Sequence, residues 1–340
     1  MCSAKMKRMP ELRRDPLSGR WVIIATDRAY RPSDIPRAAP APAGSYCPFC
    51  PGHEGATPPE ILAYRPGGSG PNGPGWTVRV VPNRYPALMI EGDLDRSGFG
   101  LYDRMHGIGA HEVIVESPSH APDLGDQSVD QVEAVLAAFR DRIQDLRRDV
   151  RFRSILVFKN RGRPAGATLD HGHSQLIALP ILPAVVADEL ESAKKHFDAH
   201  ERCLFCDIVA QERKEGARVV AENDEAIAFA PWAARSPFET WVLPRKHHSH
   251  FEDTPRGPLR GVAALLRDTL KRLDVALEKP AYNFMLHTAP LREQAMAHYH
   301  WHFEIVPALS QVAGFEWGSG FHINPTPPEE AAAFLRKLEI

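Results

Sequence analysis

The stretch Phe158-Lys-Asn-Arg-Gly-Arg-Pro-Ala-Gly-Ala-Thr-Leu-Asp-His-Gly-His-Ser-Gln175 decides the fold that the sequence predicts. Its first residue ends one apolar run, a glycine-rich basic loop follows, and His171, His173 and Gln175 alternate at the entry to a second apolar run. Because alternate residues of a strand point to the same face, these three side chains are expected to project together. Glycine allows close approach to the backbone and arginine adds positive charge, so the loop is typical of a phosphate site.

His173 is the candidate nucleophile of this stretch. A neutral imidazole, with an ordinary pKa near ~6.5, attacks without a separate base once a hydrogen bond holds its second nitrogen. The alternative is that His171 and His173 are structural strand histidines. Their clustering with Gln175 behind a glycine- and arginine-rich loop favours chemistry over structure.

Composition limits the classes of partner. The chain has 340 residues and is 43% hydrophobic, which is enough to bury a full core in one large domain or two ordinary ones. The net charge of −2 argues against a nucleic-acid or membrane partner, so any phosphate site must be local. No window approaches the length of a membrane span, and a cytoplasmic location is expected.

Four of the five cysteines form two C-x-x-C pairs, Cys47/Cys50 and Cys203/Cys206. Without a signal peptide, such pairs favour metal or redox chemistry over structural disulfides. A thioredoxin-like motif would stand at a turn from strand to helix, whereas Cys47 follows a loop rich in proline and alanine and Cys50 precedes Pro51-Gly52. Metal is therefore the favoured interpretation.

The second half of the chain repeats the pattern of the first. His171 follows His120 by 51 residues, and His298 follows His247 by 51. We expect a duplication, with one half at 1–183 and the other at 184–340, and one tetrahedral zinc site in each. The predicted ligands are Cys47, Cys50, His120 and His171 in the first site and Cys203, Cys206, His247 and His298 in the second. His250 is the alternative to His247 as a ligand. For the second site, the alternatives to zinc are another metal and a site that has kept its cysteines without metal.

The elements predicted from apolar periodicity follow the same order in both halves. The expected strands are 21–25, 76–81, 111–116, 154–158, 176–179, 218–221, 225–230, 240–243 and 282–286. Helices are expected from Ser128, where Ser128 and Gln131 form a capping box, and over 184–200 and 259–277.

Several motifs together indicate a family. They are Gly19-Arg-Trp-Val-Ile-Ile, Asp27-Arg-Ala-Tyr-Arg-Pro, Cys47-Pro-Phe-Cys50, Asn83, Ser117-Pro-Ser-His120, the stretch 158–175 and Phe321-His-Ile-Asn-Pro-Thr-Pro-Pro-Glu-Glu. In these motifs the chain resembles the galactose-1-phosphate uridylyltransferase branch of the histidine triad superfamily, over nearly its whole length. The resemblance implies an α+β fold in which two histidine-triad repeats form an antiparallel half-barrel with helices packed outside.

The resemblance also implies roles for individual residues. His173 would be the nucleophile, His171 and His120 would join the cysteines on zinc, and Gln175 would bond a phosphoryl oxygen. The remaining substrate-binding positions would be Asn160, Gly166 and Thr168 at the phosphates, Asn83 near the nucleotide, and Arg28 and Arg31 near the sugar phosphate. In some family enzymes the second metal is held by residues that correspond to Glu189, His287, His300 and His302. Many members have proline where this chain has Gly172. A homodimer is expected.

The activity implied is nucleotidyl transfer in galactose and carbohydrate metabolism. UMP would move between UDP-glucose and galactose 1-phosphate by a ping-pong mechanism through a covalent nucleotidyl-histidine. The partners would be a nucleoside diphosphate sugar and a sugar 1-phosphate. The alternative is an adenylyltransferase of the ADP-glucose phosphorylase type, because the tail at 313–320 lacks a lysine found near the substrate in well-known uridylyltransferases. A nucleotide hydrolase would favour histidine at position 175, and a zinc-built binding module would not need the loop before His171.

Overall fold

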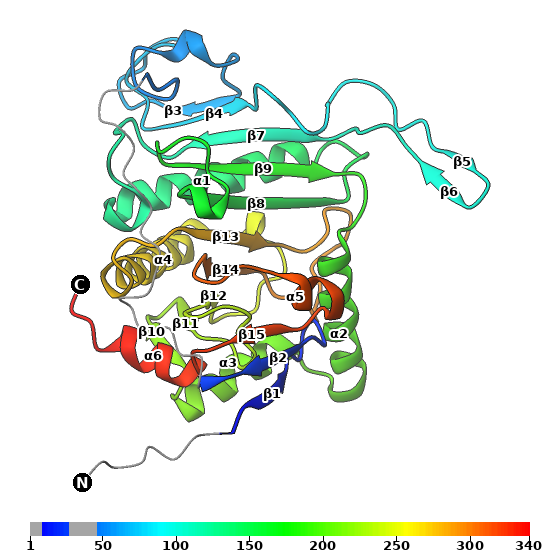
Figure 1. The fold of residues 1–340 in the computed structure, drawn as a ribbon. Coiled ribbons are helices and arrows are strands. Elements are labelled where there is room, and N and C mark those ends of the chain that lie inside the picture. The colour runs from blue at the N-terminus through cyan, green and yellow to red at the C-terminus, as the bar shows by residue number, and fades with distance from the viewer. Residues whose placement is uncertain (1–8, 27–45) are drawn as a thin grey trace.

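The computed structural model describes residues 9–26 and 46–340, so the expected ligand-binding residues Arg28 and Arg31 lie outside the described residues. The fold is α+β, as predicted, with a large antiparallel sheet and helices packed on it (Figure 1). The strands are β1 (Glu11–Arg14), β2 (Trp21–Ile24), β3 (Leu62–Tyr64), β4 (Val78–Pro82), β5 (Ser97–Phe99), β6 (Tyr102–Arg104), β7 (Ala110–Val115), β8 (Ser154–Arg161), β9 (His173–Leu179), β10 (Val219–Glu222), β11 (Ala226–Phe229), β12 (Thr240–Pro244), β13 (Tyr282–His287), β14 (His302–Pro307) and β15 (His322–Asn324). The α-helices are α1 (Val129–Leu146), α2 (Ala184–His200), α3 (Leu204–Glu215), α4 (Arg256–Ala276), α5 (Gly314–Ser319) and α6 (Pro328–Arg336).

The main sheet has ten strands among the described residues, in the order β10-β11-β12-β14-β13-β8-β9-β7-β4-β3. Antiparallel pairing of β8 with β13 joins the two halves of the chain in one continuous sheet. On either side of this joint the strand orders are β8-β9-β7 and β13-β14-β12, which correspond when each half is taken in chain order. The duplication and the division at residue 183 stay predictions.

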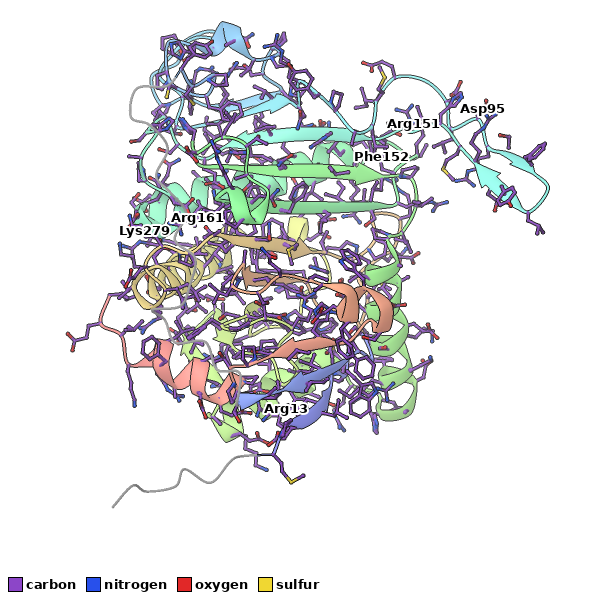
Figure 2. All side chains as sticks on the ribbon, viewed as in Figure 1. Arg13, Asp95, Arg151, Phe152, Arg161 and Lys279 are labelled. Atoms are coloured by element: carbon purple, nitrogen blue, oxygen red, sulfur yellow. The ribbon has the colours of Figure 1, made fainter. Side chains whose placement is uncertain are left out.

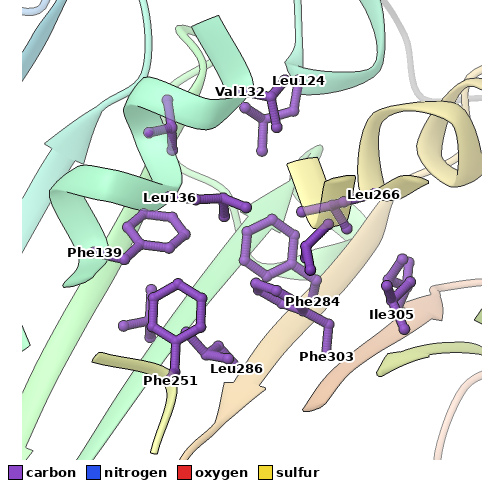
Figure 3. Packing of buried hydrophobic residues seen from close by; sticks show 14 of the residues in the cluster. Leu124, Val132, Leu136, Phe139, Phe251, Leu266, Phe284, Leu286, Phe303 and Ile305 are labelled. Carbon is purple, nitrogen blue, oxygen red and sulfur yellow. The ribbon is translucent and has the colours of Figure 1, made fainter. Parts of the chain in front are cut away.

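Two long helices, α1 and α4, pack side by side against one face of the sheet. Figure 3 shows this core, in which side chains of α1 and α4 meet residues of β13 and β14. All the labelled residues are fully buried: Leu124, Val132, Leu136, Phe139, Phe251, Leu266, Phe284, Leu286, Phe303 and Ile305. The alternation of β13 explains this packing, because Phe284 and Leu286 face the helices while Asn283 and Met285 face the other way.

The start of α1 differs from the expected capping box in one respect. Ser128 Oγ accepts a hydrogen bond from the Gln131 backbone N–H at 3.2 Å, as predicted for an N-cap. The Gln131 side chain does not return the bond. It donates instead to the carbonyl oxygens of Thr77 and Glu116, at 2.8 and 2.6 Å. The amide therefore ties the helix to the sheet, which a reading of local sequence could not anticipate.

The opposite face of the sheet is covered unequally in the two halves. In the second half, β11 and β12 are covered by apolar side chains of three elements, namely Phe205 and Val209 of α3, Ala193 of α2 and Leu17 of the β1–β2 turn. A small sheet of β1, β2 and β15 lies on the same side (Figure 1). In the first half this face carries partly exposed residues of β7 and β9. Within the described part of the chain, no helix is long and apolar enough to cross a membrane.

Candidate active site

His173 is the first residue of β9, and one hydrogen bond fixes its imidazole. Nδ1–H donates to the carbonyl oxygen of His171 at 2.8 Å, so in the neutral ring the proton stands on Nδ1 and Nε2 keeps its lone pair. Burial lowers the pKa of His173 to about 4, and the charge of Lys159 adds to this effect. The side chain is only 7% exposed. His173 is thus a neutral, oriented imidazole whose free nitrogen is available to attack.

A cluster of two thiols and two imidazoles lies at the start of β9. The ligand atoms of Cys47, Cys50, His120 and His171 all lie within 4.8 Å of one another, so the four predicted residues come together. Nδ1 of His171 is 3.6 Å from each sulfur, and its Nε2–H donates to the carbonyl oxygen of Ser117 at 2.8 Å. That bond is the usual outer support of a metal-bound histidine, and the donor set suits a tetrahedral metal ion such as zinc.

The position between the paired histidines explains why glycine stands there. A Cβ added at Gly172 would lie 3.2 Å from Glu116 Oε2 and 3.6 Å from the Pro122 carbonyl oxygen. Glu116 is buried behind the strand, where its carboxylate accepts bonds from Lys159 Nζ at 2.7 Å and from Ser174 Oγ at 2.6 Å. The proline expected from the family resemblance would crowd this carboxylate, so Gly172 fits the buried ion pair of Glu116 and Lys159.

Gln175 projects from β9 beside two residues of the neighbouring strands. Its Oε1 lies 2.9 Å from Nε2 of His111 and 3.5 Å from Nδ2 of Asn83. Asn83, predicted near the nucleotide, therefore meets the predicted phosphate residue Gln175. His111 was not among the predicted site residues, although its position at the start of an apolar strand, like that of His173, was a usable signal.

The glycine-rich loop is held from the second half of the chain. Asn283 Nδ2 donates to Oδ1 of Asn160 at 2.7 Å and to the carbonyl oxygen of Ala165 at 2.8 Å. Gly162 and Gly166 have φ values of +76° and +90°, which only glycine adopts readily. Gly166 and Thr168 are exposed on the loop, and Asn160 is half-buried at its start.

Two expectations about this loop need correction. Arg161 does not offer a free charge to a phosphate, because it pairs with Asp274 of α4 and with Asp123 at 3.2 Å. Figure 2 shows Arg161 at the β8 end near α4. The backbone N–H groups of residues 165, 166 and 167 donate to carbonyl oxygens within the loop, so they are not open phosphate donors here. Arg163 remains exposed.

The second cysteine pair also lies in a four-residue cluster, but with a different histidine from the one predicted. Cys203, Cys206, His247 and His300 place their ligand atoms within 4.8 Å of one another, and His298 is not in the group. His300 precedes β14 by two residues, as His171 precedes β9, and His302 Nδ1–H donates to the His300 carbonyl oxygen at 3.2 Å. The equal spacing of 51 residues was therefore misleading.

The structure places His247, and not His250, beside the second cysteine pair. His247 Nδ1 lies 3.4 Å from the Cys206 sulfur, and its Nε2–H donates to the Met296 carbonyl oxygen at 2.9 Å. His250 points elsewhere, with Nδ1 at 2.9 Å from Ser249 Oγ. The second cluster thus matches the first in ligand type. Its outer hydrogen bond is made by His247, whereas Nε2 of His300 is buried with no hydrogen-bond partner among the described residues.

A third group occupies the position in the second half that corresponds to His173. Glu189, His287, His302 and Glu304 are buried with ligand atoms within 4.8 Å of one another. Burial disfavours the charged imidazole, but Glu189 and then Glu304 raise the pKa of His287 to about 9. Glu304 also pairs with Arg235. His300, expected with this group from family enzymes, belongs instead to the cysteine cluster. In the second half, this position is therefore occupied by a buried cluster of charged groups.

Comparisons with known proteins agree with this geometry. A family model described as galactose-1-phosphate uridyl transferase, N-terminal domain, matches residues 2–183, and a domain of unknown function matches residues 108–338. The chain is 37% identical to ADP-glucose phosphorylase of Arabidopsis thaliana, over 97% of this chain and 93% of that protein. It is 28% identical to galactose-1-phosphate uridylyltransferase of Thermotoga maritima, over 98% of this chain and 99% of that protein.

Solved structures give the same picture. The crystal structure of the Arabidopsis thaliana ADP-glucose phosphorylase with bound ADP-glucose superposes with a TM-score of 0.83 at 35% identity, covering 98% of this chain and all of that one. A uridylyltransferase structure superposes with a TM-score of 0.76 at 31% identity, covering 96% of this chain and 97% of that one.

Proposed function

The chain belongs to the galactose-1-phosphate uridyl transferase family of nucleotidyltransferases, and on that premise we propose that His173 carries a nucleoside monophosphate between two phosphate acceptors. The observation that carries the proposal is the hydrogen bond from His173 Nδ1–H to the His171 carbonyl oxygen, which leaves Nε2 free on a neutral ring. Neutral imidazole is the form that attacks phosphorus, and burial keeps it neutral.

The proposed reaction has two balanced steps. Nε2 of His173 attacks the α-phosphorus of a nucleoside diphosphate sugar, a P–N bond forms, and the bond from that phosphorus to the bridging oxygen breaks. The sugar 1-phosphate leaves as an anion, so no general acid is required. An incoming phosphate or sugar 1-phosphate then attacks the same phosphorus and releases Nε2. A covalent histidine lets a single pocket take each phosphate partner in turn, which gives ping-pong kinetics.

Stabilisation of the transition state is assigned to neutral donors more than to arginines. Charge in phosphoryl-type transfer is spread over the non-bridging oxygens, and preorganised hydrogen-bond donors stabilise it without reorganisation. Gln175 stands two residues after the nucleophile on the same face of β9. Because an amide neither gives nor takes a proton at neutral pH, Gln175 is expected to activate water poorly. The intermediate would then wait for its acceptor.

For the donor, we favour ADP-glucose with inorganic phosphate as acceptor. The support is the 37% identity with the Arabidopsis thaliana ADP-glucose phosphorylase, together with the tail at 313–320. This choice reverses the order of the two donors given by sequence resemblance alone. UDP-glucose with galactose 1-phosphate is the second candidate, supported by nearly full-length similarity to the Thermotoga maritima uridylyltransferase.

Competing donors assayed under one set of conditions are expected to separate the two candidates. Purified full-length protein would receive ADP-glucose or UDP-glucose with inorganic phosphate, glucose 1-phosphate or galactose 1-phosphate as acceptor. We expect the highest kcat/KM for ADP-glucose with phosphate, with release of ADP and glucose 1-phosphate. Turnover of UDP-glucose with galactose 1-phosphate, and none of ADP-glucose with phosphate, would move the protein to the second candidate.

A metal count on single-residue variants is expected to identify the ligands of the second site. We propose that each cysteine cluster binds one zinc ion, because two thiolates and two imidazoles complete a tetrahedral set. His300→Ala should then lose one of two metal ions per chain, and the nearby control His298→Ala should keep both. Metal would be measured by atomic emission on protein purified without added metal. One ion lost from His298→Ala and none from His300→Ala would contradict this assignment.

A further inference from the structure

His111 contacts the side chain of Gln175 from the neighbouring strand. In the antiparallel pair of β7 with β9, Val113 lies opposite Gln175, and His111 lies two residues away on the same face. Nε2 of His111 is 2.9 Å from Gln175 Oε1, a good hydrogen-bond distance. His111 is half-buried and belongs neither to a cysteine cluster nor to the glycine-rich loop.

The backbone fixes which ring nitrogen of His111 carries the proton. The N–H of Ala87 donates to Nδ1 of His111 at 3.2 Å, so Nδ1 must have its lone pair free. In the neutral ring the proton is therefore on Nε2, which donates to Oε1 of Gln175. His111 is thus a donor to Gln175, and the direction of this bond follows from the fold.

Asn83 adds to the same end of the amide. Its Oδ1 accepts the N–H of Tyr85 at 2.9 Å, which fixes the asparagine amide with Nδ2 towards Gln175. Nδ2 also lies 3.1 Å from His111 Nε2, but both atoms carry hydrogen, so the acceptor they share is Gln175 Oε1. With its oxygen bound in this way, Gln175 keeps its two-proton Nε2 for a ligand.

We propose that His111 is a positioning residue for nucleotidyl transfer, which holds the amide oxygen of Gln175 so that the amide nitrogen meets the phosphoryl oxygens. An amide turned by half a rotation would present a carbonyl oxygen to an anionic group and would repel it. The inference rests on the proposed function, since it concerns the donor to the nucleotidyl group on His173. According to this proposal, His111 on β7 determines whether Gln175 presents its amide nitrogen, a donor, or its amide oxygen, an acceptor, to the ligand.

A purely structural role for His111 is the competing explanation. The backbone of His111 joins the two ends of the segment between β4 and β7, because the Asn83 N–H donates to the His111 carbonyl oxygen at 2.8 Å. That bond does not involve the side chain, whereas the bond from Ala87 N–H to His111 Nδ1 does, so loss of the imidazole also removes one contact to this segment. A test must therefore ask whether the imidazole acts through Gln175.

A double-mutant cycle answers this question. The readout is the single-turnover rate at which the wild type, His111→Phe, Gln175→Ala and the double variant take label on His173 from ADP-glucose or UDP-glucose labelled in the α-phosphate. Removing a preorganised donor costs roughly 10²- to 10³-fold in rate, and Gln175→Ala should fall in this range. His111→Phe should lose at least about tenfold, the effect of one hydrogen bond. The double variant should be no slower than Gln175→Ala, because coupled residues are not additive.

Two further measurements separate positioning from folding. His111→Gln, which restores an N–H donor, should recover most of the rate lost in His111→Phe, while donor affinity and metal content stay at wild-type values in both. If His111→Phe melts early or loses metal, His111→Leu takes its place in the cycle.

The positioning role would be overturned if His111→Phe took label at the wild-type rate. It would also be overturned if His111→Phe lowered the labelling rate as much on the Gln175→Ala background as in the wild type. The proposed function fails differently, by the absence of label from the wild-type protein with either donor.

Discussion

Replacing His173 with alanine is expected to abolish both the labelling of the protein by a sugar nucleotide and its turnover. Nε2 of His173 is the atom to which we assign the bond with the α-phosphorus, and alanine leaves no nucleophile in its place. Loss of a covalent nucleophile, or of the group that orients it, lowers kcat by roughly 10⁴- to 10⁶-fold in well-studied enzymes. The measurement is single-turnover labelling and steady-state turnover of the purified variant, with circular dichroism and metal content as checks on folding.

Gln175→Ala is the matched control for that variant. Gln175 lies on the same face of β9 as His173, two residues along the strand. Its replacement by alanine removes a hydrogen-bond donor and leaves His173 unchanged. We expect slow labelling of His173 that still reaches completion, whereas His173→Ala should show none at any time. Full labelling of His173→Ala would mean that another residue carries the nucleotidyl group.

Loss of the first cysteine pair is expected to have the second large effect. Cys47→Ser with Cys50→Ser should lose one metal ion per chain, because serine offers no thiolate. His171 would lose its anchor, and its carbonyl oxygen is the acceptor that orients His173. A structural zinc site contributes on the order of 10 kcal/mol in small zinc domains, so the melting temperature should fall sharply. Labelling should fall with it.

The second cysteine pair supplies the control for this experiment. Cys203→Ser with Cys206→Ser should also lose one metal ion. The second cluster precedes His302 and not His173, and His302 is fully buried among Glu189, His287 and Glu304. Labelling of His173 should therefore survive better in this variant than in the first, at a temperature where both remain folded. Equal labelling in the two variants would show that the first cluster does not position the nucleophile.

Much of the site follows from local sequence patterns. Alternation placed His173 and Gln175 on one strand, and the C-x-x-C pairs indicated two clusters, because both depend on spacings of a few residues. His298 was predicted wrongly because an equal count between distant histidines ignores loop length. The local rule, a histidine two residues before each strand, identifies His300 correctly, since strand geometry and not total spacing sets where a side chain points.

What the sequence could not reveal depends on contacts between distant elements. Arg161 looked like a phosphate ligand beside glycine, but Asp274 lies more than a hundred residues away and reaches it only through the packing of α4. The role of His111 depends on the register of β7 with β9 and on Ala87 N–H, neither of which has a local signature. Helix α3 was not predicted from the sequence, although it begins directly after its N-cap Cys203.

The most direct test of this account is the chemical identity of the intermediate. Full-length protein mixed with α-phosphate-labelled ADP-glucose, and separately with labelled UDP-glucose, in the absence of acceptor should become labelled on one peptide, the one containing His173. The bond should be labile in acid and stable in base, as a phosphoramidate is, and addition of the acceptor should discharge it at the rate of turnover. Turnover without any protein-bound label, with a sequential rate law and intersecting double-reciprocal lines, would contradict the covalent mechanism.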